Sequence, residues 1–115
     1  MINSNELDPC GKAQHESGAK LDAGENRLGL VLLGFARALQ EVGKVGTYGA
    51  NKYTDNGWVE VLDGVPRYTD AMLRHLLREA TGEERDPDND LHHAAHLAWN
   101  ALARLDLTLR QAEKI

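Results

Sequence analysis

The sequence predicts an all-α fold, a small helical bundle with one loop rich in glycine and aromatic residues. Three stretches repeat apolar residues at steps of three and four, which is typical of helices that lie on a core. One short segment, around Asp63 and Gly64, has instead the composition of a strand or hairpin. Because three helices of this length bury little surface alone, we expect the bundle to be completed by oligomerisation.

The first helix is expected from about residue 28 to residue 45. Its apolar stripe consists of Val31, Phe35, Ala38, Val42 and Val45. Gly34, Gly43 and Gly46 cost helix stability. We therefore expect a break or a close helix contact near either end of this helix.

The loop rich in glycine and aromatic residues is expected at residues 46–58, GTYGANKYTDNGW. Lys52 lies there among Tyr48, Tyr53 and Trp58. Aromatic rings of this kind can stack on a base while the lysine meets a phosphate. Packing of the rings against the core explains them equally well.

Two further helices are expected after this loop. The second runs from about residue 68 to residue 80, and Gly82 and Pro87 then enforce a loop over residues 81–90. The third begins near Asp90, a good N-cap, and continues to about residue 112. It carries a narrow apolar seam that suits either antiparallel helix packing or a dimer. The seam consists of Leu91, Ala95, Ala98, Leu102, Leu105 and Leu109.

Length and composition predict a single folded domain. The chain has 115 residues, of which 42% are hydrophobic and 27% are charged, values typical of a globular protein. Residues 1–17 are polar, contain Pro9 and Gly11, and show no periodicity. We expect them to form a flexible tail, and residues 18–115 to form one helical domain.

Charge and cysteine usage restrict the partners and the compartment. The net charge is -5 with no basic block, so we expect no duplex nucleic acid, although a nucleotide phosphate can still be bound locally. The longest apolar run, residues 28–36, is too short to cross a bilayer. Cys10 is the one cysteine and cannot form an internal disulfide. We expect a cytoplasmic protein without a membrane partner.

Polar residues gather on one face of the third predicted helix, opposite the seam. His93, His96, Asn100 and Arg104 follow at steps of three, four and four. Such a face is commonly solvated, but Leu97 on the same side indicates that it is partly covered. His93 and His96 could then ligate a metal, or could simply be buried and hydrogen-bonded.

Oxygen ligands for such a metal are close in the sequence. The acidic residues that could supply them are Glu79, Glu83, Glu84, Asp86, Asp88 and Asp90. The HExxH zinc motif is absent, and Mg²⁺ prefers carboxylates and water to histidine. The spacing by itself therefore leaves the metal open.

His75 and Glu79, at positions i and i+4, form a candidate acid–base pair. In such a pair the carboxylate orients the imidazole and raises its pKa, as a general base requires. The same pair is also an ordinary contact on a helix surface, worth about 0.3 kcal/mol.

Four motifs, taken in order, resemble a known phage family. They are GAKLDAGENRLGLV, EVGKVGTYGANKYTDNGW, RYTDAMLRHLLREATGEERDPD and LHHAAHLAWNALARL. Together they resemble the phage-encoded dATP/dGTP diphosphohydrolase N-terminal domain family over residues 18 to about 110. The resemblance implies a phage protein of the host cytoplasm, largely helical, that acts on purine deoxynucleotides or adjoins a domain that does.

Members of this family with known chemistry are similar to the all-α nucleoside triphosphate pyrophosphohydrolases. Those enzymes hold Mg²⁺ or Mn²⁺ with ExxE and ExxD carboxylates and direct water at the triphosphate. Two positions here depart from many relatives: Lys44 replaces an acidic residue, and Glu25 replaces a lysine. The first change leaves EVGK where an ExxE would stand, which puts a direct transfer of the two-metal mechanism in doubt.

The resemblance carries over to particular positions of this chain. The matching residues are Glu41, Lys52, Tyr53, Trp58, Arg74, His75, Gly82, Glu83, Asp86, His93, His96 and Asn100.

Motifs and resemblance together define the candidate site. The candidate catalytic residues are Glu41, His75 and Glu79. The candidate nucleotide-binding residues are Lys20, Lys52, Tyr48, Tyr53, Trp58, Arg74 and Asn100. The candidate ligands for Mg²⁺ or Mn²⁺ are Glu83, Asp86, His93 and His96.

Three functions are compatible with these residues. The first is metal-dependent hydrolysis of purine (deoxy)nucleoside triphosphates to monophosphate and pyrophosphate, for phage control of the nucleotide pool. The second is nucleotide binding without turnover, either to sequester a host second messenger against host defence or as a recognition domain beside a separate catalytic domain. The third is a structural homo-oligomer whose histidines fill an interface.

Overall fold

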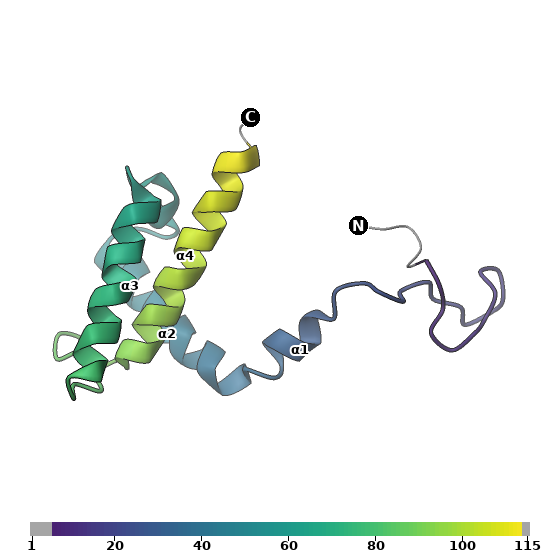
Figure 1. Cartoon of the computed structure of the whole chain (residues 1–115), viewed down its shortest axis with the longest axis horizontal. Coiled ribbons are helices and arrows are strands. Elements are labelled where there is room, and N and C mark those ends of the chain that lie inside the picture. The colour runs from purple at the N-terminus through teal and green to yellow at the C-terminus, as the bar shows by residue number, and fades with distance from the viewer. Residues whose placement is uncertain (1–5, 114–115) are drawn as a thin grey trace. The chain divides into compact units, whose positions relative to one another are not determined.

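The computed structural model describes residues 6–113 as helices joined by turns, so the predicted all-α fold is confirmed (Figure 1). The helices are α1 (Leu28–Leu32), α2 (Ala36–Lys52), the short 3-10 helix η2 (Gly57–Glu60), α3 (Gly64–Ala80) and α4 (His93–Glu113). Within the described range, β pairing is limited to one isolated bridge between Arg85 and His92. None of the helices in residues 6–113 is long and apolar enough to cross a membrane.

The chain divides into two units, and the boundary between them in the sequence falls between Gly34 and Phe35. The first unit, described from residue 6, consists of turns and α1. Asp8 organises its turns, since its carboxylate accepts hydrogen bonds from the backbone amides of Cys10 at 2.7 Å and Lys20 at 3.0 Å. The predicted boundary between tail and domain at residue 18 stays a prediction.

The first predicted helix, residues 28–45, is wrong as one continuous element. Its first turns form α1, and a separate helix, α2, begins at Ala36. Gly34 lies in the intervening turn, where a side chain would collide with the carbonyl oxygen of Leu30. The break that the glycines predicted therefore separates the two units.

The loop predicted at residues 46–58 is wrong for its first half, because α2 continues to Lys52. A Cβ at Gly46 would lie 3.4 Å from Nε1 of Trp99 in α4, so this glycine lets the two helices approach closely. Helix–helix contact thus overrides the low helix propensity of the glycines. Of the predicted loop, residues 53–58 lie outside α2, in a bend, a turn and the start of the 3-10 helix.

The hairpin predicted around Asp63 and Gly64 is also wrong. Asp63 adopts a left-handed conformation with φ of 53°, and α3 begins at the next residue. Gly64 is buried against Leu107 of α4, and Pro66 lies in the first helical turn, where no backbone donor is needed. The second predicted helix therefore starts four residues earlier than expected. Gly82, with φ of 105°, follows its end as predicted.

The core of the second unit lies between α3 and α4, with α2 packed against α4 (Figure 1). It is unusually polar for its size. The buried apolar residues are Val45, Ala95, Ala103 and Leu107, and the buried polar residues are Asp86, His93, His96 and Asn100.

The C-terminal part of the apolar seam of α4 does not fill this core. Leu102, Leu105 and Leu109 are each more than half exposed, whereas the histidine face points inward. Packing of the seam within the chain is therefore wrong for these three leucines, although Ala95 of the same seam is buried in the core. Use of the seam in a dimer stays a prediction. Helix α4 also begins at His93 and not near Asp90, because Asp90 has a left-handed φ of 58°.

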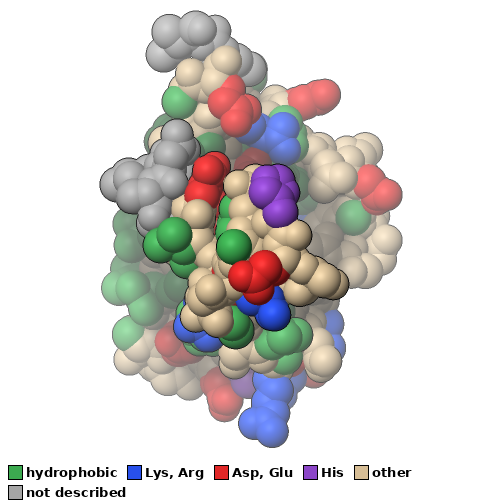
Figure 2. Space-filling model, turned by 90° about the vertical axis from the view of Figure 1, so that its right-hand side faces the viewer, with side chains coloured by type: hydrophobic (Ala, Val, Ile, Leu, Met, Phe, Trp, Pro, Cys, Tyr) green, Lys and Arg blue, Asp and Glu red, His purple; other side chains and the backbone are tan. Residues whose placement is uncertain are grey.

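Charges on the surface are mixed. Acidic and basic side chains occur in small separate groups on the face that Figure 2 shows. That face presents no continuous basic track among the described residues.

Candidate metal and nucleotide site

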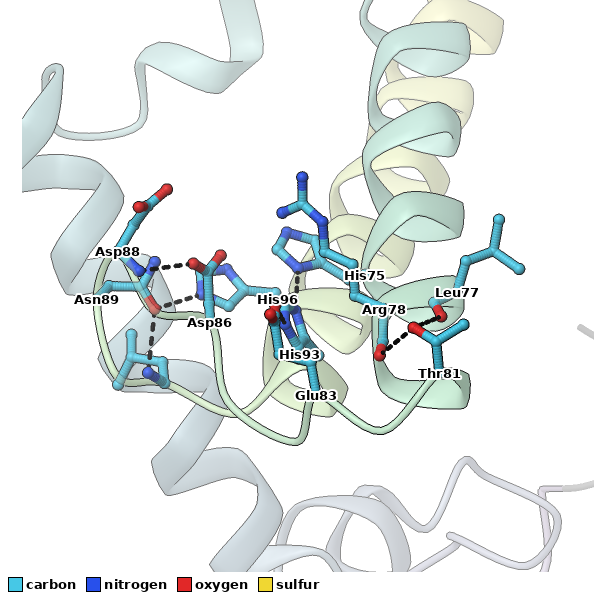
Figure 3. Close-up of polar contacts among 11 residues, drawn as sticks. His75, Leu77, Arg78, Thr81, Glu83, Asp86, Asp88, Asn89, His93 and His96 are labelled. Carbon is cyan, nitrogen blue, oxygen red and sulfur yellow. Dashed lines mark hydrogen bonds and ion pairs between the residues drawn. The ribbon is translucent and has the colours of Figure 1, made fainter.

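The end of α3, the start of α4 and the loop between them bring three histidines and several acidic residues together (Figure 3). His75 comes from α3, and His93 and His96 share one face of α4. The loop closes on itself, because the Asp86 amide donates to the carbonyl of Leu91 at 2.8 Å. This closure holds the Asp86 carboxylate beside the imidazoles.

His93 is at the centre of a short hydrogen-bonded chain. Its Nδ1 lies 2.8 Å from Nδ1 of His75, and its Nε2 lies 2.7 Å from Oε1 of Glu83. The His93 side chain is 0% exposed, so both ring nitrogens are satisfied inside the protein. Glu83, one of the predicted metal ligands, therefore contacts the central imidazole.

His96 lies beside this chain. Its ring stacks on that of His75, with centroids 4.4 Å apart, and its Nε2 lies 3.0 Å from Oδ1 of Asn89. Asn100, predicted to bind nucleotide, donates from Nδ2 to the His96 carbonyl oxygen at 2.8 Å. The hydrogen bond of the Asn100 side chain is therefore made to the backbone of its own helix, α4.

Three of these residues could hold a metal ion. One ligand atom each from His75, Asp86 and His93 lies within 4.8 Å of the others. Of the predicted ligands, the structure brings Asp86 and His93 into this group, together with His75, which was predicted to be catalytic. We call these three residues the His75–Asp86–His93 cluster.

The surroundings of His75, His96 and Asp86 shift the pKa values of these three side chains. Burial lowers the pKa of His75 from 6.5 to about 4, with repulsion from His96 and His93 adding to the effect. Burial also lowers the pKa of His96. For Asp86, burial raises the pKa, but the hydrogen bond from the Asp88 amide and the three imidazoles outweigh it, so the net pKa is lowered. His75 and His96 are therefore neutral at pH 7 and Asp86 is charged, the states in which they can bind a cation.

The expected pair of His75 and Glu79 does not form. His75 hydrogen-bonds to His93 instead, and its pKa is lowered where the sequence predicted a raised value. Glu79 and Arg74 are exposed on α3 and make no side-chain hydrogen bond or ion pair within residues 6–113.

Part of the predicted nucleotide-binding set lies next to the histidines. The ring of Tyr48 meets that of His96 edge to face at 6.4 Å. Nζ of Lys52 lies 5.8 Å from the Tyr48 centroid and 5.4 Å from that of Tyr53, and these tyrosines raise the pKa of Lys52. Tyr53 is 73% exposed. An aromatic and cationic group at the end of α2 therefore adjoins His96, which stacks on His75 of the cluster.

Other predicted residues lie elsewhere. Trp58 meets Trp99 edge to face at 6.1 Å, and both line a shallow recess along the C-terminal half of α4. Glu41 pairs with Lys44 at 2.6 Å, and this hydrogen bond is the main reason that its pKa is lowered; His92 and Arg85 act in the same direction. Lys20 belongs to the unit of residues 6–34.

Two residues near the cluster were not predicted. Asn89 holds His96, and Arg78 is close enough to His75 to help lower its pKa. Arg78 follows His75 by three positions on α3, a spacing that places both on one helix face. That spacing could have identified Arg78 from the sequence.

The fold and the cluster define an all-α chain with a His/Asp/His group that could hold a metal ion. The chain belongs to the family described as dATP/dGTP diphosphohydrolase, N-terminal, which it matches over residues 15–114. This confirms the resemblance seen in the four motifs. A protein of Salmonella phage PMBT28 named dATP/dGTP diphosphohydrolase is 34% identical over 82 residues, which are 71% of this chain and 27% of the relative. The chain thus matches about a quarter of that relative's length. No solved structure matches it.

Proposed function

We propose that the chain acts in the metal-dependent hydrolysis of purine (deoxy)nucleoside triphosphates to monophosphate and pyrophosphate. The observation that carries the proposal is the His75–Asp86–His93 cluster, whose ligand atoms lie within 4.8 Å of one another. Membership of the family and the name of the phage relative point to the substrate class.

The cluster fits one divalent cation. It offers two imidazoles and one carboxylate, and Asp86 is the only buried carboxylate in the described part of the chain. Hydrolysis with two ions about 3.5 to 4 Å apart requires several converging carboxylates, so a single ion suits this site better. When bound there, a divalent ion would polarise a phosphoryl oxygen and lower the pKa of a water.

The residues around the cluster match the other needs of the substrate. Lys52 is charged at neutral pH as any exposed lysine is, and the neighbouring tyrosines raise its pKa further. Lys52 and Arg78 would neutralise phosphate oxygens, where negative charge develops as the bond breaks. Tyr48 would offer its ring to the purine.

A base must accept a proton from the attacking water. His75 serves as a ligand in this proposal, which leaves Glu41 and Glu79 as the predicted carboxylates. Glu41 is the nearer candidate to the loop, since His92 and Arg85 act on its pKa. To act as a base, the Glu41 carboxylate would first have to break its ion pair with Lys44, which has an N–O distance of 2.6 Å.

The direct test is turnover of dGTP and dATP by the whole chain with Mn²⁺, Zn²⁺ or Mg²⁺, with dCTP as a comparison substrate. Chromatography should find dGMP and pyrophosphate in equal amounts. We expect Asp86→Asn and His75→Ala to abolish turnover, and Asp88→Asn, which changes an exposed carboxylate of the same loop, to retain it. Release of inorganic triphosphate and deoxynucleoside would refute the proposed bond cleavage.

A second function is favoured by the length of the relative, most of which lies outside the match. In this alternative the chain recognises the nucleotide and a separate domain performs the chemistry. It predicts tight binding by calorimetry and intact nucleotide after denaturation, with every divalent ion. Recovery of dGMP from the same sample would exclude this alternative.

A further inference from the structure

We infer that the His75–Asp86–His93 cluster takes a first-row transition-metal ion in preference to Mg²⁺, and that Glu83 orients His93 without being a ligand. The inference rests on the proposed function for the presence of a metal at this site. It names the class of ion and the role of Glu83, and its tests use no nucleotide.

The donor set is the first reason. Imidazole nitrogens suit Mn²⁺ to Zn²⁺, whereas Mg²⁺ requires oxygen ligands in near-ideal octahedral geometry. Two of the three side chains of the cluster are histidines, and His93 is 0% exposed. Two histidines and one carboxylate also leave coordination positions open for water and substrate.

The spacing of the two imidazoles is the second reason. Two nitrogens bonded to one ion at about 2.0 to 2.1 Å lie roughly 3 Å apart. The Nδ1 atoms of His75 and His93 are 2.8 Å apart. The rings therefore need to separate only slightly to share an ion.

Hydrogen bonding assigns the role of Glu83. An ionised carboxylate can only accept, so the 2.7 Å contact requires a proton on Nε2 of His93. In a neutral ring Nδ1 then carries a lone pair, and this is the nitrogen that faces His75. A carboxylate that holds the far nitrogen of a histidine ligand in this way orients the ring and strengthens the ligand.

His75 can adjust to the ion. Without metal, its Nδ1–H donates to the lone pair of His93. On binding, this proton moves to Nε2 of the same ring, through water, and the ring stays neutral. Nε2 of His75 has no hydrogen-bond partner within residues 6–113, and no buried side-chain nitrogen or oxygen there lacks one, so Nε2 is open to solvent. Stacking on His96 keeps the ring directed at His93 during this change.

Metal titration of the chelator-treated full chain tests the ion class. We expect Zn²⁺ and Co²⁺ to bind at least about tenfold more tightly than Mg²⁺, with Co²⁺ giving visible absorption bands that His93→Ala removes. Equal or tighter binding of Mg²⁺ would overturn the assignment. Metal binding without nucleotide turnover would refute only the proposed function.

Variants of Glu83 test its role. Glu83→Ala should weaken Zn²⁺ binding by about 10- to 100-fold, and Glu83→Gln, which keeps an acceptor oxygen, should lose less. Glu84→Ala is the matched control, since it removes an adjacent exposed carboxylate that does not contact His93. Equal losses in Glu83→Ala and Glu84→Ala would show a general charge effect and overturn the role.

Nitrogen NMR of the histidine rings in the metal-free protein provides a readout that a merely structural role would not affect. We expect His93 to carry its proton on Nε2 in the wild type and in Glu83→Gln, and to populate both tautomers in Glu83→Ala. A doubly protonated His93, or one with the proton on Nδ1 in the wild type, would overturn the inference.

Discussion

The rings of His75 and His96 lie parallel, 4.4 Å between centroids and inclined by 5°, although they come from different helices. This stack fixes the orientation of His75, whose Nδ1 meets His93 at 2.8 Å. His96 has its own anchor in Asn89. The direction of one cluster ligand thus depends on a neighbour that is not in the cluster.

Replacing His96 with alanine should weaken Zn²⁺ binding by about tenfold, because His75 loses its support. The free energy of unfolding should fall by about 1 to 3 kcal/mol, because Asn89 loses a partner and a buried ring is removed. Calorimetric titration and denaturant unfolding measure the two effects. His92→Ala is the control, as His92 lies outside the stack. Complete loss of metal binding would instead make His96 a ligand, as the sequence predicted.

The metal-free protein should lose stability as the pH falls from about 6.5 towards 4. The pKa of His75 is lowered from 6.5 to about 4, so the unfolded chain binds more protons in this window, and unfolding becomes easier as protons are added. His96 acts in the same direction, and Asp86 opposes part of the effect on His75. Each pKa unit corresponds to about 1.4 kcal/mol, and partial exposure of His75 reduces the total to the order of 2 kcal/mol.

Urea unfolding in the presence of a chelator, at several pH values, measures this dependence. His75→Gln should flatten the profile between pH 4 and 6.5, because the glutamine does not titrate. A wild-type protein that grows more stable on acidification through this range would contradict the lowered pKa.

The spacing of residues along the sequence correctly predicted which side chains share one face of a helix. The steps from His93 to His96 and Asn100 place all three on one face of α4, and all three are buried. Leu97 on the same side indicated that this face is partly covered, but the leucine seam on the opposite face was expected to pack as well, and its residues Leu102 and Leu105 are exposed. A periodic seam identifies a helix face but not its partner.

Contacts between residues distant in the sequence explain the other differences between the predictions and the structure. Gly46 continues α2 because it meets Trp99, and Gly64 begins α3 because it meets Leu107. Gly64 was interpreted from local propensity as part of a turn. Gly46 was placed at the start of the predicted loop, although it was also one of the glycines expected to allow a close helix contact. His75 was paired with its helical neighbour Glu79, whereas its partner His93 is 18 positions away. Spacing within one helix does not reveal such contacts.

Gly64→Ala should destabilise the fold by about 1 to 3 kcal/mol, as expected for overpacking of a full site. An added Cβ would lie 2.6 Å from Cδ1 of Leu107 in α4. Gly43→Ala is the matched control, because a Cβ there meets nothing within 4 Å, and alanine should stabilise α2 by about 0.5 to 1 kcal/mol. Thermal or urea unfolding checks both. If Gly64→Ala were as stable as the wild type, α3 and α4 would not approach closely at this point.

Lys52→Met should raise the Kd for dGTP by about tenfold if Lys52 contacts a phosphate, and the loss should shrink at high salt, because exposed charges are screened. Lys52 carries its charge beside Tyr48, which adjoins His96. Lys44→Met is the control on the same helix, since the ammonium of Lys44 is paired with Glu41. Calorimetry or fluorescence titration with dGTP in the absence of added metal separates binding from turnover. Equal affinities of the Lys52→Met and Lys44→Met variants would remove Lys52 from the nucleotide site, leaving Arg78 and the metal to neutralise the phosphates.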